Sequence, residues 1–176
     1  MKRALMATVV FAFAAAPAFA QTGQPRSATP ADQTFLVNTA KAGLAEVEFG
    51  KVALENATNE QVKAFAQRMV DDHSKANEEL KTLAASKNVV VPSTLDAQDK
   101  GMQDKLMALK GEAFDREYMT AMVAGHTKVV ESLRAESQSG KDPDVKAWAA
   151  KTLPTVEDHL KMARETNRAV GTSGKK

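Results

Sequence analysis

The spacing of apolar residues constrains the fold of this chain more than any other feature of its sequence. Between Asp32 and Val170, apolar residues recur about every 3.6 positions, and no stretch alternates between apolar and polar residues as a strand does. The sequence therefore predicts an all-α protein. Its 176 residues are enough for one domain with a substantial core and too few for two large ones.

Breaks in the pattern divide this region into four long helices and one short helix. Asp32 is the predicted N-cap of the first helix, and Asp142 caps the last one, with Pro143 in its first helical position. Pro154 predicts a kink inside the last helix. The predicted long helices cover residues 32–56, 59–86, 112–138 and 143–170, and the short one covers 95–110.

The lengths of the connections predict how these helices pack. The first and second long helices are joined by a short connection, as are the third and fourth, so each pair is expected to form an antiparallel hairpin. The longer connection between the hairpins contains the short helix. The predicted architecture is an antiparallel four-helix bundle with an extra short helix between its second and third long helices.

The N-terminus has the pattern of a secretory signal peptide. A positively charged start is followed by an apolar run over 4–16, a proline, and the small residues of a cleavage site at Ala18 and Ala20. The sequence predicts a signal peptide over 1–20 with cleavage after Ala20, and hence a periplasmic protein. A flexible lead-in over 21–31, the bundle over 32–170 and a disordered tail over 171–176 are expected to follow.

Charge and cysteine content exclude several classes of function. Removal of Lys2 and Arg3 with the signal peptide leaves 24 − 2 = 22 basic residues against 22 acidic ones, and such a neutral chain is not expected to bind nucleic acid. The absence of cysteine excludes disulfides, cysteine-based zinc sites and thiol nucleophiles. No transmembrane segment is predicted after signal cleavage.

The three histidines carry the main chemical prediction, since His73, His126 and His159 fall on three different predicted helices. Counting from the predicted turns places all three, together with Glu46, near the middle of the bundle and within about two helical turns of one another. His126 lies about 60° from the centre of its apolar stripe, so its pattern leaves open whether it faces the core. Neutral imidazoles suit Cu, Fe or Zn, and the four residues are predicted to bind one such ion. The alternative is a metal-free hydrogen-bonded cluster.

Methionines accompany the histidines at helical spacing. Met69 and Met122 each precede a histidine by four residues, and Met162 follows His159 by three. Met69 and Met122 are therefore possible additional ligands, since thioethers together with imidazoles suit Cu(I). The alternative is that these methionines simply fill the core.

Several segments together resemble a bacterial family of unknown function, DUF4142, sometimes labelled a predicted outer-membrane protein. The segments are Gly43–Val47 (GLAEV), Val62–Ala66 (VKAFA), Met69–His73 (MVDDH) and Lys151–Pro154 (KTLP), which runs on to His159. The resemblance implies a ferritin-like bundle outside the cytoplasm and no established activity. Ferritin-like di-iron sites use Glu-x-x-His motifs, but valines stand three residues before each histidine, at Val70, Val123 and Val156.

Without those glutamates the sequence predicts a non-enzymatic protein with no catalytic residues, acting in metal or envelope-stress homeostasis. One alternative is a structural or interaction bundle that self-associates or binds an envelope protein. It is suggested by a second apolar stripe on the first helix, which consists of Phe35, Ala42, Ala45, Phe49 and Val52. The other is a mononuclear metal oxidase or a peroxide-handling enzyme that uses the same ligands with an open coordination position.

Overall fold

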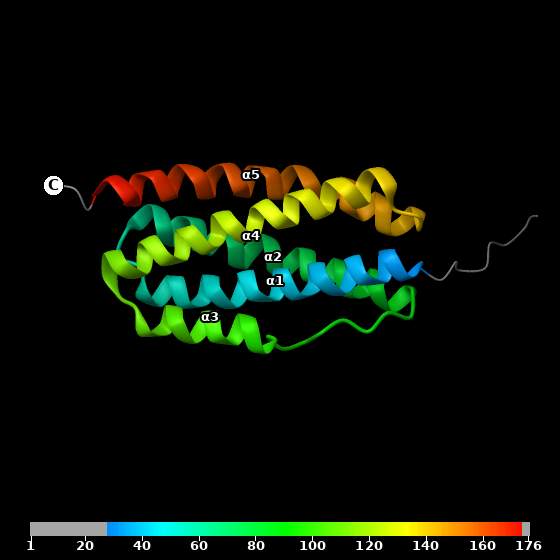
Figure 1. The fold of residues 1–176 in the computed structure, drawn as a ribbon, viewed down its shortest axis with the longest axis horizontal. Coiled ribbons are helices and arrows are strands. Elements are labelled where there is room, and N and C mark those ends of the chain that lie inside the picture. The colour runs from blue at the N-terminus through cyan, green and yellow to red at the C-terminus, as the bar shows by residue number, and fades with distance from the viewer. Residues whose placement is uncertain (1–27, 174–176) are drawn as a thin grey trace, which may run out of the picture.

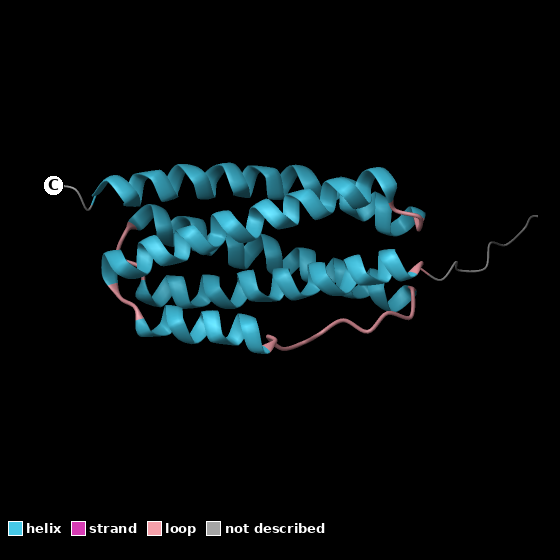
Figure 2. Ribbon diagram, viewed as in Figure 1, coloured by secondary structure: helices cyan, strands magenta, loops and turns pink. Residues whose placement is uncertain are grey.

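The computed structural model describes residues 28–173, which form five helices and no strand (Figure 2). The helices are α1 (Pro30–Asn56), α2 (Glu60–Ser86), α3 (Ala97–Ala108), α4 (Gly111–Ser139) and α5 (Pro143–Ser173). The prediction of an all-helical chain is confirmed. The predicted signal peptide over 1–20, with its cleavage site, lies outside the described residues.

The four long helices lie side by side along the long axis of the molecule (Figure 1). The turns over 57–59 and 140–142 reverse the chain, so α2 returns along α1 and α5 returns along α4. The two hairpins contact each other through α1 with α4 and through α2 with α5. The connection over 87–96 and α3 carry the chain back along the bundle, and α2 and α4 consequently run in the same direction (Figure 1).

The first helix begins earlier than its sequence pattern predicts. Thr29, and not Asp32, is the N-cap: the Thr29 side chain accepts a hydrogen bond from the Asp32 backbone N–H, and the Asp32 carboxylate accepts one from the Thr29 N–H. Pro30 occupies the first turn, where its missing N–H costs no helical bond. Thus the last residues of the predicted lead-in belong to α1. At the other end, α5 continues through Pro154 and on to Ser173, into the predicted tail.

Two buried aspartates fix the hairpins against each other at opposite ends of the bundle. Asp32 of α1 accepts backbone N–H bonds from Lys141 (2.9 Å) and Asp142 (3.2 Å) in the α4–α5 turn. Asp115 of α4 accepts backbone N–H bonds from Thr58 (3.2 Å) and Asn59 (3.0 Å) in the α1–α2 turn. Each hairpin therefore satisfies otherwise unpaired donors in the other hairpin's turn, which fixes the longitudinal register between them.

The second apolar stripe of α1 is covered within the chain. Ala45, Phe49 and Val52 belong to a core cluster that includes Leu106 of α3. Phe35 packs against Trp148 of α5 with ring centroids 6.3 Å apart. The short helix and the opposite hairpin thus bury four of the five residues of this stripe, and Ala42 is half-buried.

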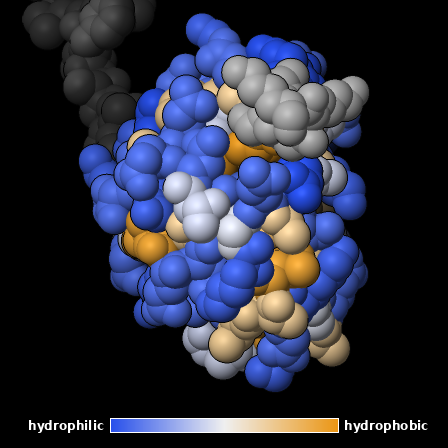
Figure 3. Space-filling model, turned by 90° about the vertical axis from the view of Figure 1, so that its left-hand side faces the viewer, coloured by the Kyte–Doolittle hydropathy of each residue, from blue (hydrophilic) through white to orange (hydrophobic). Residues whose placement is uncertain are grey.

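No helix among residues 28–173 is both long enough and apolar enough to cross a membrane. Figure 3 views the end of the molecule that carries the α1–α2 turn. Hydrophilic residues cover most of this end, and hydrophobic ones form only small separate patches.

Glu136 gives the stability of the fold a distinctive pH dependence. Burial and the neighbouring carboxylates of Asp32 and Asp142 raise the pKa of Glu136 from 4.5 to about 7. Because the folded protein binds this proton more tightly than the unfolded chain does, stability falls as the pH rises from about 4.5 to about 7. Glu136→Gln is expected to raise the free energy of unfolding by about 1–2 kcal/mol at pH 8 and by little at pH 4.5.

Urea unfolding at the two pH values measures this difference. Glu131→Gln, which changes an exposed glutamate on the same helix, is the matched control and is expected to have a small effect at both pH values. An equal gain at pH 4.5 and pH 8 for Glu136→Gln would contradict the assignment of a raised pKa.

Candidate metal centre

The three histidines come from three helices and meet in the interior. His73 projects from α2, His126 from α4 and His159 from α5, and all three side chains are buried. The fourth predicted residue, Glu46 of α1, is also buried and lies beside His73 and His126. The structure therefore brings all four predicted residues together, and His126, whose orientation the sequence left open, faces the core with no exposed surface.

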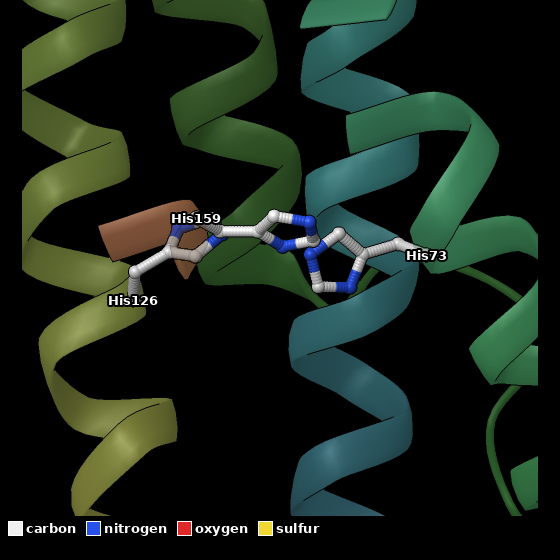
Figure 4. A group of neighbouring side chains, drawn as sticks. All are labelled: His73, His126 and His159. Atoms are coloured by element: carbon white, nitrogen blue, oxygen red, sulfur yellow. The ribbon is translucent and has the colours of Figure 1, made fainter. Parts of the chain in front are cut away.

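The imidazole rings converge on one another (Figure 4). Ring centroids are 5.1 Å apart for His73 and His159, 5.6 Å for His73 and His126, and 5.7 Å for His126 and His159. One nitrogen from each ring lies within 4.8 Å of one nitrogen from each of the others. The reciprocal aspartate contacts explain this alignment, since they hold the helix carrying His73 in register with those carrying the other two.

Each ring has one nitrogen in contact with a polar group other than the two neighbouring rings. His73 Nδ1 lies 3.0 Å from Glu46 Oε2. His126 Nδ1 donates to the backbone carbonyl of Met122 at 2.9 Å and lies 3.4 Å from Glu46 Oε1. His159 Nε2 donates to Asp72 Oδ2 at 2.8 Å. Contacts of this kind fix the tautomer and the orientation of an imidazole.

The other nitrogen of each ring has no hydrogen-bond partner among residues 28–173. These atoms are His73 Nε2, His126 Nε2 and His159 Nδ1, and all three are buried. Buried polar atoms in folded proteins nearly always have partners, so three unpartnered nitrogens in one cluster call for a physical explanation. If the outer nitrogens carry the protons, the inner ones present lone pairs, which is the arrangement typical of metal-binding histidines.

Burial and charge set the protonation of the cluster. Burial raises the pKa of Glu46, but His126 and His73 more than offset this effect and hold it at about 2. Burial lowers the pKa of His126, and it lowers that of His159 to about 4. For His73, the neighbouring Glu46 outweighs burial and raises the pKa. These shifts favour the neutral forms of His126 and His159, whose lone pairs are then available, and Glu46 supplies a negative charge beside His73 and His126.

The three methionines near the histidines lie in different surroundings. Met69 and Met122 are buried in the core cluster, and it is the backbone carbonyl of Met122 that contacts His126. The sulfur of Met162 accepts a hydrogen bond from Arg68 Nη1 at 2.8 Å. Nothing in these contacts tests whether Met69 or Met122 binds a metal ion, so their ligation stays a prediction.

The sequence analysis missed Asp72 and Arg68. Asp72 contacts His159 at 2.8 Å, and Arg68 contacts Asp72 at 3.2 Å. Both residues belong to the polar face of α2, and that pattern is typical of solvated side chains. Their four-residue spacing could have indicated the contact, because it places Arg68 beside Asp72, the aspartate that precedes His73.

This site defines an all-helical protein with a buried cluster of three histidines and one carboxylate. The family model described as Domain of unknown function (DUF4142) matches residues 15–166. The chain therefore belongs to the DUF4142 family, which confirms the resemblance seen in its sequence motifs. None of the curated proteins shows significant similarity to the chain.

Solved structures share the fold at low sequence identity. A DUF305 fragment from Deinococcus radiodurans superimposes with a TM-score of 0.69 at 14% identity, over 82% of this chain and 98% of that one. CopM in its Cu(I)-bound form gives a TM-score of 0.65 at 18% identity, over 78% of this chain and 96% of that one. CopM in its Cu(II)-bound form gives 0.66 at 19% identity, with the same coverage.

Proposed function

We propose that this protein is a ferritin-like antiparallel four-helix bundle that binds one transition-metal ion. The proposed ligand atoms are His73 Nε2, His126 Nε2 and His159 Nδ1. The observation that carries the proposal is that these three buried nitrogens lack partners while the opposite side of each ring is held by a polar group. A metal-free hydrogen-bonded cluster would also pair Glu46 with His73, so the support for a metal ion comes from the inner nitrogens and not from the outer contacts.

The spacing of the rings supports an ion of ordinary size. Each of the three rings offers one nitrogen within 4.8 Å of a nitrogen of each of the others, and three atoms spaced in this way share a point no more than about 2.8 Å from each of them. Metal–imidazole bonds are about 2.0–2.1 Å long, so each nitrogen would move inward by less than about 1 Å. Side-chain adjustment can supply this shift without movement of the helices.

Glu46 has a supporting role in this proposal. Its two oxygens face Nδ1 of His73 and Nδ1 of His126, on the sides of the rings away from the proposed ligand nitrogens. A carboxylate in this position orients the rings, increases their basicity and offsets the charge of the ion. Glu46 therefore acts through the histidines in this arrangement.

The donor set fits all three metals considered, and the comparison with CopM favours copper among them. Imidazoles suit Cu, Fe and Zn, but the absence of Glu-x-x-His motifs argues against a di-iron site. The two CopM structures, which share this fold, are described as bound to Cu(I) and to Cu(II). We accordingly propose a non-enzymatic, exported copper-binding protein that acts in metal or envelope-stress homeostasis.

Metal content tests the proposal directly. The chain from Gln21, produced without a histidine tag, is expected to retain about one equivalent of copper after dialysis against copper and then against metal-free buffer. Elemental mass spectrometry measures the retained metal, with parallel samples dialysed against iron and zinc. Zinc or iron retained in place of copper would change the metal assigned, and less than about 0.1 equivalent of all three would refute the proposed function.

A further inference from the structure

We propose that the metal ion enters and leaves between α2 and α5, and that Arg68 closes this route. The inference rests on the proposed function, because it concerns access to the histidine site. It follows from the different surroundings of the three rings and from the position of Arg68 on the surface.

Only one of the polar contacts made by the rings leads outward. His73 and His126 contact Glu46, which is 5% exposed, and the backbone carbonyl of Met122, whose residue is 3% exposed. His159 instead contacts Asp72, whose side chain is 38% exposed. Among the described contacts of the cluster, Asp72 thus forms the direct link between a buried imidazole and solvent.

Arg68 lies beside the contact between Asp72 and His159 and spans the seam between α2 and α5. Its Nε lies 3.2 Å from Asp72 Oδ2 on α2, and its Nη2 lies 2.9 Å from Asp158 Oδ2 on α5. Its Nη1 donates to the sulfur of Met162, also on α5, at 2.8 Å. The guanidinium is therefore surrounded by two carboxylates and a thioether, next to the aspartate that contacts His159.

These neighbours are donors that a copper ion can use in transit. Carboxylate oxygens bind Cu(II), and thioether sulfur binds Cu(I). When the Arg68 side chain swings into solvent, the donors of Asp72, Asp158 and Met162 become available to an incoming cation. Exposed ion pairs are individually weak, so Arg68 moves away readily. Its presence is therefore expected to slow metal exchange by only about tenfold.

The opposite side of the cluster has only a narrow opening. A cavity of about 20 Å³ lies beside Glu46 and His73, which is room for about one water molecule and too little for a hydrated ion. Asn77 lies over this side, so close to Gly43 that a Cβ at position 43 would be 2.1 Å from Asn77 Oδ1.

Stopped-flow mixing of the untagged full mature chain with Cu(II) sulfate tests this route. Trp148, the only tryptophan, lines the same small cavity as Glu46 and His73, so its fluorescence serves as the signal. Excess EDTA gives the dissociation rate. Arg68→Ala is expected to raise both the association and dissociation rates about tenfold and to leave Kd nearly unchanged. Asp158→Asn removes the ion pair between Arg68 and α5 but leaves the Arg68 contact with Met162, and it alters no residue that contacts a histidine, so it is expected to raise both rates by a smaller factor.

Two variants serve as comparisons. Arg134→Ala removes a similar exposed ion pair, with Glu157 at 2.6 Å, between α4 and α5, and is expected to leave both rates unchanged. Asn77→Ala loosens the opposite side of the cluster. Unchanged rates for both Arg68→Ala and Asp158→Asn would overturn the proposal, as would acceleration by Asn77→Ala alone. These outcomes are distinct from failure of the proposed function, in which the parent chain binds no copper.

Discussion

Replacement of His126 by alanine is expected to abolish metal binding at physiological concentrations and to remove the stabilisation that metal confers. In the parent chain, copper at 100 times its Kd is expected to add about 2.7 kcal/mol to the free energy of unfolding. For a domain of this size, this corresponds to a rise in Tm of about 5–10 °C. His126 is fully buried, so no exposed side chain is placed to replace the lost imidazole ligand in the variant. Differential scanning calorimetry with and without copper measures the rise.

Two further variants separate loss of a ligand from loss of stability. Leu36→Ala, like His126→Ala, removes a fully buried side chain, but Leu36 lies on α1, ten residues from Glu46. This variant is expected to lower Tm but to keep the copper-induced rise. Glu46→Gln keeps the ligands and removes the supporting charge, so its affinity for copper is expected to fall by about 10–100-fold. A full copper-induced rise in His126→Ala would show that copper binds elsewhere.

Replacement of Asp115 by alanine is expected to destabilise the metal-free protein by about 2–4 kcal/mol. Asp115 is 2% exposed and accepts three hydrogen bonds: from the backbone N–H groups of Thr58 and Asn59, and from the Thr58 hydroxyl at 2.9 Å. Alanine leaves these donors unpaired in a partly buried turn, and each such donor costs roughly 1–3 kcal/mol where water cannot reach it. Guanidinium unfolding is expected to show a lower midpoint with an unchanged slope.

Asp104→Ala is the matched control, since Asp104 is an exposed aspartate on α3. It is expected to change the free energy of unfolding by less than about 0.5 kcal/mol. Asp115→Asn keeps one acceptor oxygen and is expected to recover part of the loss. Equal stabilities for Asp115→Ala and Asp104→Ala would show that the turn finds other partners.

Much of the fold was predictable because helical periodicity, caps and prolines are local properties of the sequence. The last helix begins as predicted, with Asp142 accepting N–H bonds from Asp144 and Val145 and with Pro143 in the first position. The start of α1 was misplaced because Asp32 also fits the pattern of an N-cap. Its actual role, bonding to Thr29 and to the distant α4–α5 turn, depends on tertiary contacts that no local pattern contains.

For the candidate site, the sequence predicted the level of its residues along the helices but not how all of them are oriented. Counting from the turns brought the three histidines and Glu46 to one level, because helix rise is constant and the turns are short. The orientation of His126 required the packing of α4 against its neighbours. The roles of Asp72 and Arg68 also required it, since an exposed aspartate and arginine on a helix normally indicate only solvation.

The distribution of the histidines gives a bound ion a mechanical consequence. His73 belongs to the first hairpin, whereas His126 and His159 belong to the second. An ion held by all three would join the hairpins as a covalent cross-link does, closing a loop of roughly 50 residues that is worth about 4 kcal/mol in the chain-entropy model. A chain without cysteine would thereby gain a reversible cross-link between its hairpins, which a metal chelator releases.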